Sequence, residues 1–210
     1  MCLSPPSRRS GAPGARELAS WRCSFSAADG RCLPAGRHRP GGGGTELTYD
    51  EVGATLGQLP GGYRHGTYAV DLGMDARSFG RAVEALRQWR THREAEIDLC
   101  PRCPAIEEGT VIGQLVRVGP LYAIACCRIV RVVNEEDRFG FAYGTLPAQP
   151  ERGEEAFIVT HEAHRVRFEI TAFSRPRHPL ARLGGPVTRA VQDRVSQRYL
   201  NGVRNYLKEP

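Results

Sequence analysis

Five apolar runs that follow one another between residues 110 and 174 constrain the fold of this chain more than any other feature. Turn-forming or charged residues separate the runs, which cover residues 110–118, 122–133, 138–146, 154–161 and 164–174. Apolar runs of this length with such short separations are typical of strands joined by tight turns. The sequence therefore predicts an antiparallel meander over this region.

The residues before the meander indicate one strand and one helix. Residues 63–72 alternate as a half-buried strand does, and Asp75 suits a helix N-cap. Apolar side chains then recur every three or four positions as far as Trp89, which is typical of one helix face. We expect a strand over 63–72, a helix over 76–92 and a short strand near Ile97.

A second helix is predicted at the end of the chain. Gly184, Gly185 and Pro186 favour a helix start, with the proline at the first helical position. Apolar side chains then repeat mostly every four positions from Val187 to Leu207. This pattern predicts an amphipathic helix of about twenty residues, roughly 30 Å long.

The order of these elements indicates an α+β fold. A curved antiparallel sheet of about six to seven strands must cover its apolar inner face, and only the long C-terminal helix has the size to do so. Such an arrangement is called a helix-grip fold. We expect it to occupy residues 45–210 as a single domain.

Residues 1–44 have a different composition and are expected to form a disordered tail. They are rich in Gly, Pro and Arg, and their seven arginines against Glu17 and Asp29 account for +5 of the net charge of +6. The remaining residues are thus almost neutral. A nearly neutral domain has no general attraction for a phosphate backbone, so no nucleic-acid partner is expected.

Neither a membrane span nor an export signal is predicted. The longest apolar run, Leu121 to Cys127, is far too short to cross a bilayer. The apolar stretch from Trp21 to Phe25 is interrupted by Arg22 and Ser24, which does not suit a secretory signal. A cytoplasmic location is therefore the expectation.

The cysteines do not make a strong case for a metal. Cys100 and Cys103 have the spacing of a zinc knuckle or of a redox pair, and Cys126 with Cys127 would have to complete a zinc site. A redox pair usually opens a helix, whereas Pro101 and Pro104 place this motif in a loop. Adjacent strand residues point to opposite faces, so reduced, unreactive thiols are the favoured interpretation and no metal is expected. Phosphate-binding loops, dinucleotide fingerprints and the Gly-x-Ser-x-Gly motif are absent from the sequence, and no cofactor is predicted.

Hairpin registers predict which polar side chains face the core. A turn at residues 134–137 and a turn at 162–163 would align Arg128, Tyr143, Glu155 and Ile170 across four neighbouring strands, on the apolar face. Charges on such a face must pair, or meet water or a polar ligand. We interpret Arg128 and Glu155 either as a structural ion pair or as polar anchors of an otherwise apolar pocket.

Several histidines receive simpler interpretations. His161 and His164 flank a predicted hairpin turn and are expected to be solvated. His92 follows Trp89 at the end of the first helix, where interaction with the helix dipole is a sufficient explanation.

Three functions from different classes are compatible with these residues. The leading hypothesis is a binding protein for a small apolar or amphipathic molecule, with candidate pocket residues Trp89, Arg128, Phe141, Tyr143, Glu155, Phe157 and Phe168. One alternative is an enzyme that uses Glu155 as general acid or base with help from Tyr143. The other is a module with a filled interior that binds a protein or a membrane surface. Oligomeric state stays open.

Local sequence also suggests a family. Segments 139–147, 150–157, 173–176 and 180–188 have unusual Gly and Pro placement, and they resemble the uncharacterised family called domain of unknown function 1990. The resemblance spans about Leu47 to Leu207. It implies a fold of the Bet v 1/START-like kind, whose members hold apolar or amphipathic ligands between sheet and helix. Gln149 replaces a histidine expected in relatives, and Cys100 to Cys103 is not part of the family pattern.

Overall fold

A seven-stranded antiparallel sheet forms the body of the protein. The computed structural model describes residues 24–26, 31–33, 46–118, 121–147, 149, 151–177 and 185–210. Along the sheet the strand order is β3-β9-β8-β7-β6-β5-β4, so the first long strand pairs with the last. The strands are β3 (Arg64–Gly73), β4 (Ile97–Cys100), β5 (Val111–Val118), β6 (Leu121–Asn134), β7 (Arg138–Thr145), β8 (Glu151–Glu162) and β9 (Arg165–Pro176).

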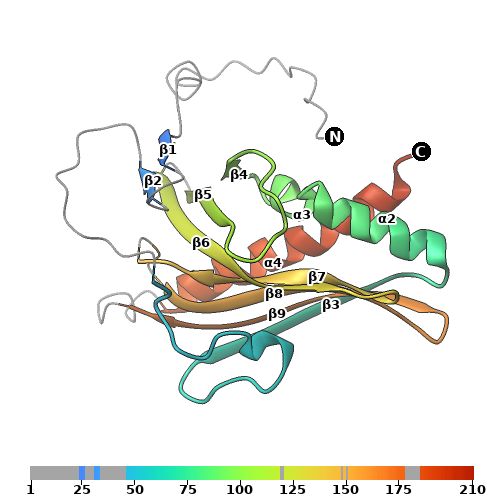
Figure 1. The fold of residues 1–210 in the computed structure, drawn as a ribbon, viewed down its shortest axis with the longest axis horizontal. Coiled ribbons are helices and arrows are strands. Elements are labelled where there is room, and N and C mark those ends of the chain that lie inside the picture. Colours follow the sequence, from blue (N-terminus) through green and yellow to red (C-terminus); the bar gives the residue numbers. More distant parts are fainter. Residues whose placement is uncertain are drawn as a thin grey trace.

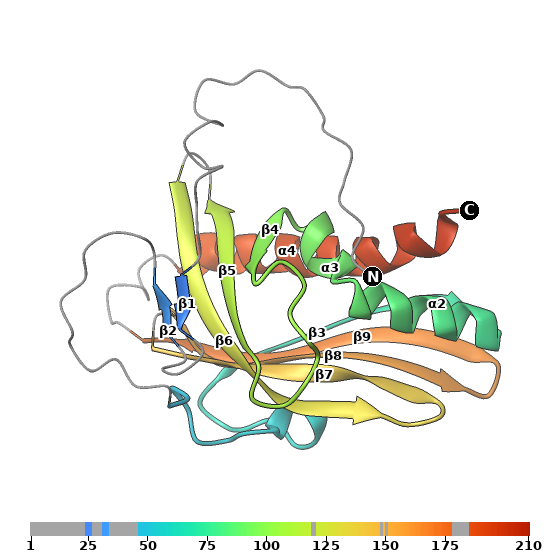
Figure 2. The ribbon, with the colours of Figure 1, turned by 45° about the horizontal axis from the view of Figure 1, so that its top comes forward.

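Helices cover one face of this sheet. They are α2 (Ala76–Arg87), α3 (Arg90–Glu94) and the long α4 (Gly185–Lys208), and a short 3-10 turn η1 (Ala54–Leu56) lies on the opposite face (Figure 1). Strands β5 and β6 bend up beside α4, so the sheet curves around the helix (Figure 2). The expected helix-grip arrangement is confirmed. In the described part of the chain, no helix is long and apolar enough to cross a membrane.

The predicted tail is described only in part. Strands β1 (Ser24–Ser26) and β2 (Arg31–Leu33) pair as a separate two-stranded antiparallel sheet. The expectation of disorder for the rest of residues 1–44 lies outside the described residues.

The predicted helix over 76–92 is interrupted at Trp89. Its start is as expected, because Oδ1 of Asp75 accepts a hydrogen bond of 2.7 Å from the Ser78 amide. Trp89 has a left-handed backbone (φ 54°), which ends α2 and starts α3 in a new direction. That conformation is costly for a residue with a side chain. Burial of the indole and its 2.9 Å hydrogen bond to the Pro104 carbonyl offset the cost.

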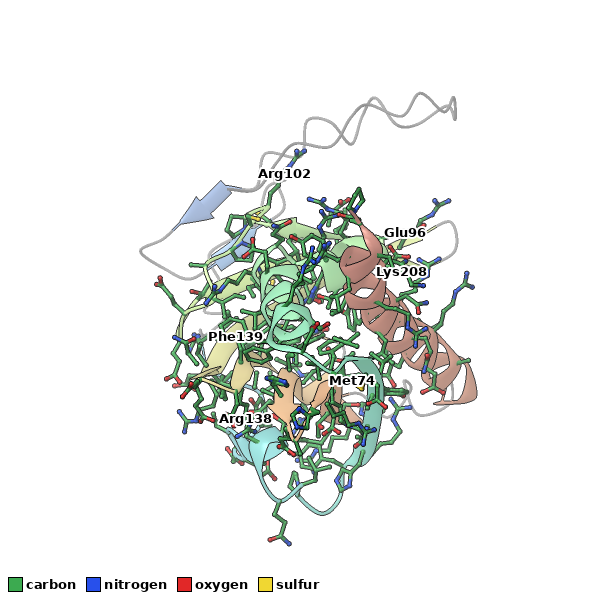
Figure 3. The ribbon with its side chains drawn as sticks, turned by 90° about the vertical axis from the view of Figure 1, so that its right-hand side faces the viewer. Met74, Glu96, Arg102, Arg138, Phe139 and Lys208 are labelled. Carbon is green, nitrogen blue, oxygen red and sulfur yellow. The ribbon has the colours of Figure 1, made fainter. Side chains whose placement is uncertain are left out.

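The main apolar core lies between the sheet and the helices. Large aromatic side chains from the inner faces of β7, β8 and β9 meet the apolar faces of α2 and α4 here. Seen from the end that carries Met74 and Arg138, α2 and α4 lie over the sheet with side chains filling the space beneath them (Figure 3). On the other face, Leu47 and Leu56 pack against a smaller cluster that includes Val130 and Ile158.

A glycine lets α4 approach α3 closely. A Cβ atom on Gly202 would lie 2.4 Å from the carbonyl oxygen of Arg90. Only glycine fits at that distance without moving one of the helices. The contact holds the second half of α4 against α3, and the first half extends over the opposite end of the sheet.

Candidate functional site

A cavity of about 400 Å³ lies between the inner face of the sheet and the first half of α4. On α4 its lining is Val191, Gln192, Val195, Ser196 and Tyr199, whose spacing places them on one helix face. On β8 the lining includes the alternating positions Glu151, Gly153 and Glu155, and also Glu154 between them. The volume is in the range of sites for drug-sized ligands.

Side-chain size explains why the cavity is at this end. Inward positions of the strands there are small, as at Gly66, Gly153 and Ala172. At the other end the corresponding positions carry fully buried phenylalanines such as Phe157 and Phe168. One half of the space between sheet and helix is therefore filled by the protein, and the other half is left open.

Tyr143 and Glu155 form a hydrogen-bonded polar pair on the cavity wall. They are directly opposed on β7 and β8, as the sequence predicts, and the Tyr143 hydroxyl donates a 2.7 Å hydrogen bond to Oε2 of Glu155. Burial raises the pKa of Glu155 to about 7, and Glu151 adds to this effect while the Tyr143 hydrogen bond opposes it. Both protonation states of Glu155 are therefore populated near neutral pH.

His92 extends this pair into the core. Its Nε2 lies 3.4 Å from the Tyr143 hydroxyl, and its Nδ1 lies 2.9 Å from Oγ1 of Thr91. Burial lowers the pKa of His92 to about 3, so the imidazole is neutral. The expectation of a role at a helix end is wrong, because the turn at Trp89 directs α3 and its histidine into the core.

Six of the seven predicted pocket residues divide into two groups. Tyr143 and Glu155 line the cavity. Four predicted wall residues instead fill the core beside it with at most 2% of their surface exposed, and they are Trp89, Phe141, Phe157 and Phe168.

Arg128 does not reach the predicted position. A β-bulge between Ile129 and Arg131 shifts the register of β6 against β7, so Ile129 rather than Arg128 is opposite Tyr143. Because side chains alternate, Arg128 belongs to the other face of the sheet. The predicted pairing of Arg128 with Glu155 is therefore wrong.

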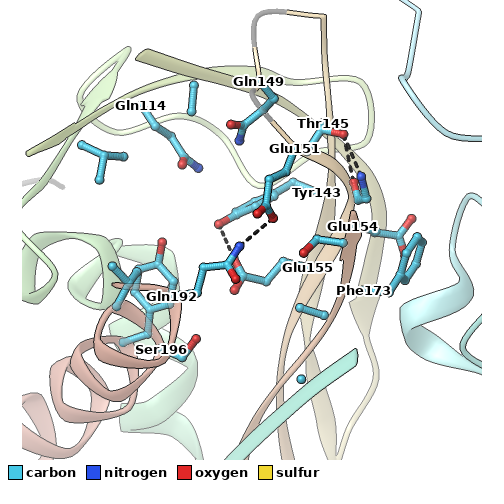
Figure 4. A pocket seen from close by; sticks show the side chains of 18 of the residues that line it. Gln114, Tyr143, Thr145, Gln149, Glu151, Glu154, Glu155, Phe173, Gln192 and Ser196 are labelled. Atoms are coloured by element: carbon cyan, nitrogen blue, oxygen red, sulfur yellow. Dashed lines mark hydrogen bonds between the residues drawn. The ribbon is translucent and has the colours of Figure 1, made fainter. Parts of the chain in front are cut away.

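Sequence reasoning missed the amide side chains of the cavity. Gln192 Nε2 donates a 2.6 Å hydrogen bond to Oε2 of Glu151, and Gln149 also lines the cavity (Figure 4). Gln114 is only 6% exposed and faces the cavity from β5. Within the described residues, Nε2 of Gln114 and Oε1 of Gln192 are buried and have no hydrogen-bond partner. A glutamine within the apolar run 110–118 is the signal that could have revealed Gln114.

Glu154 has a different function from its neighbour. It points to the outer face of the sheet, where it accepts hydrogen bonds from the Tyr49 hydroxyl (2.6 Å) and from the amides of Gly53 (2.7 Å) and Thr55 (3.1 Å). This buried carboxylate anchors the segment that carries η1. It is a structural group, in contrast to Glu151 and Glu155, whose carboxyl groups contact other residues of the cavity.

The cysteine interpretation needs correction. Cys100 and Cys103 are both disulfide-bonded, in contrast to the reduced thiols expected from the sequence. Cys126 and Cys127 are buried and are free of disulfide bonds. Cys127 packs in the inner core and Cys126 in a separate cluster with Val111 and Leu146, so the two side chains lie on opposite faces of β6, as strand alternation predicts.

Comparisons with known proteins identify relatives of this chain. A family model described as "Domain of unknown function (DUF1990)" matches residues 48–202. A UPF0548 protein of Deinococcus radiodurans is 35% identical over 170 residues, which cover 72% of this chain and 83% of that protein. A UPF0548 protein of Dictyostelium discoideum is 30% identical over 138 residues, covering 60% and 64%.

Solved structures share the fold at low sequence identity. The Zhui aromatase/cyclase of a Streptomyces species superimposes with a TM-score of 0.50 at 16% identity. The match covers 70% of this chain and 94% of that protein. At this level of identity the similarity establishes the helix-grip fold alone.

Proposed function

This chain belongs to the DUF1990 family, and from the geometry of its cavity we propose that it binds a small, largely apolar molecule between the sheet and α4. The observation that carries the proposal is the 400 Å³ cavity, whose apolar walls include Ile97, Val116 and Val195. Tyr143 and Glu155 place a few polar groups on an otherwise apolar surface, as ligand pockets do.

The same cavity separates this proposal from the module with a filled interior. Protein interiors are packed with few voids larger than a water molecule. A space of this size between sheet and helix is therefore not ordinary packing. The cavity therefore supports the binding of a small molecule over the alternative of an interaction module whose interior is filled by its own side chains.

A substitution that fills the cavity should weaken binding. Ala172 lies on the cavity wall, where a larger side chain would project into the space, so Ala172→Phe should weaken binding of the neutral dye Nile red by about tenfold or more. Dye fluorescence during titration of the full-length protein measures the affinity. Native mass spectrometry of protein purified from its own host should show a bound small molecule.

Thr171→Phe is the matched control, because Thr171 is the neighbouring residue on the other face of β9. It should leave dye affinity unchanged within about twofold. Equal affinity of the wild type and Ala172→Phe would place the dye elsewhere and would overturn the proposal.

An acid-base enzyme is the second candidate, favoured by a specific observation. The carboxyl group of Glu155 faces the cavity, has a pKa of about 7 and is held by the Tyr143 hydroxyl. A group with such a pKa transfers protons efficiently near neutral pH.

This second candidate is tested by proton exchange with an apolar ketone. In heavy water, wild-type protein should catalyse deuterium uptake next to the carbonyl of beta-tetralone, measured by mass spectrometry. Glu155→Gln should lower the rate by about a hundredfold, because the amide cannot accept the proton. Equal rates with the variant and the wild type would exclude Glu155 as the base.

A further inference from the structure

Two amide groups in the cavity have buried atoms that no described residue satisfies. Nε2 of Gln114 is a hydrogen-bond donor without an acceptor, and Oε1 of Gln192 is an acceptor without a donor. Gln114 is 6% exposed, so its amide group is almost completely removed from solvent. Buried amide atoms are almost always paired in folded proteins, and each exception requires an explanation.

The contacts around Gln192 determine which of its amide atoms has no hydrogen-bond partner among the described residues. Its Nε2 donates to Oε2 of Glu151 at 2.6 Å, a bond to a carboxylate that orients the whole amide. The carbonyl oxygen Oε1 is then the atom available to a ligand. Both glutamines line the same cavity, Gln114 from β5 and Gln192 from α4, and Figure 4 shows them on its walls.

The charges on the cavity wall indicate the ligand's charge. Among the described lining residues, the carboxyl groups of Glu151 and Glu155 are hydrogen-bonded to other cavity residues, Gln192 and Tyr143 respectively. Arg64 also lines the cavity but is exposed to solvent. An anionic group placed beside the glutamines would meet carboxylates inside the cavity, and the solvent-exposed arginine would compensate for it only weakly.

From this arrangement, and resting on the proposed binding function, we infer that the ligand is an uncharged alcohol or phenol with an apolar body, whose hydroxyl groups accept from Gln114 Nε2 and donate to Gln192 Oε1. A hydroxyl group is the simplest neutral group that can both donate and accept. An apolar molecule without one would leave both amide atoms unpaired, and a carboxylate has no proton to donate to Gln192.

Three probes of one skeleton test this inference on the full-length protein. Pyrenemethanol, methylpyrene and pyrenecarboxylic acid differ only in the polar group and are fluorescent, so their dissociation constants are measured by titration at neutral pH. Pyrenemethanol should bind about tenfold more tightly than methylpyrene, and at least tenfold more tightly than the acid. Pyrenemethanol has one hydroxyl group, so the preference for the alcohol over methylpyrene should fall to about threefold or less in at least one of the two variants Gln114→Leu and Gln192→Leu.

Gln197→Leu is the matched control, because Gln197 is exposed on α4 and does not line the cavity. It should keep the full preference for the alcohol. The inference would be overturned if the wild type bound all three probes equally or preferred the acid. It would also be overturned if both glutamine variants kept the full preference for the alcohol. In each of these cases the proposed binding function would still hold. Failure of all three probes to bind would count against the binding function itself, and the inference would fall with it.

Discussion

Replacing Phe157 by Ala should lower the free energy of unfolding by about 3–5 kcal/mol, among the largest effects expected for a single substitution in this protein. The Phe157 ring is fully buried at the centre of the inner core. It stacks on Phe141 (5.2 Å between centroids) and meets His92 (5.5 Å) and Tyr199 (5.2 Å) edge-on or tilted. Removing the ring would leave a void that these neighbours cannot close. Urea denaturation followed by circular dichroism measures the loss.

Two comparisons separate this effect from a role in ligand binding. Phe157→Leu keeps most of the apolar volume and should lose clearly less stability than the alanine variant. Met74→Ala alters a side chain that is 74% exposed, and its effect should stay within about 0.5 kcal/mol. A loss below about 1 kcal/mol in Phe157→Ala, together with weakened Nile red binding, would show that Phe157 lines the ligand space after all.

The inward face of Glu155 could be predicted because strand parity tolerates some errors of register, although its partner on β9 is Ala172 rather than the predicted Ile170. The predicted hairpin turn at 162–163 lies one residue too early, and His161 is opposite Val166 rather than His164. That shift of two residues changes the partner but keeps the face, since side chains alternate with a period of two. The approximate strand boundaries were predictable for a separate reason. The apolar runs end at charged or turn-forming residues, which mark where each strand stops.

Features that depend on single backbone irregularities could not be predicted. One bulge residue in β6 moves Arg128 to the other face, and a left-handed backbone at Trp89 brings His92 into the core. Neither position has a glycine or a proline to mark the irregularity. In both cases tertiary packing compensates for a local cost that the sequence pattern alone does not reveal.

The position of the cavity required the three-dimensional structure for another reason. It depends on which small inward residues lie next to one another on different strands, such as Gly66 on β3 and Ala172 on β9. Gln114 and Gln192 are distant in the sequence and meet the same space only because α4 crosses the curved sheet. Patterning identified the two layers, and side-chain volumes decided where the layers leave a space.

Glu155 and His92 should give the protein two opposing pH dependences of stability. The folded-state pKa of Glu155, about 7, lies above its ordinary value of 4.5, so the folded protein binds this proton more tightly and stability falls as pH rises from 4.5 to 7. The folded-state pKa of His92, about 3, lies below its ordinary value of 6.5, so stability falls as pH drops from 6.5 to 3. Each slope is at most about 1.4 kcal/mol per pH unit. Between 4.5 and 6.5 the two contributions should nearly cancel.

Replacing either Glu155 or His92 should reveal how the other residue alone makes the free energy of unfolding depend on pH. Glu155→Gln should raise the free energy of unfolding by on the order of 2 kcal/mol above pH 7, because an uncharged amide replaces the partly buried carboxylate. Between pH 6.5 and 4.5 the same variant should lose stability on acidification, because the contribution of His92 is no longer offset by that of Glu155. His92→Gln should show the reverse trend over that range, with stability falling as pH rises, and the double variant should be nearly flat. These comparisons use urea denaturation at a series of pH values, and they cancel the contributions of all other groups. A Glu155→Gln profile parallel to that of the wild type would mean that this carboxyl group has the same proton affinity in the folded and unfolded chain, and the cavity would then be open to water at its polar end.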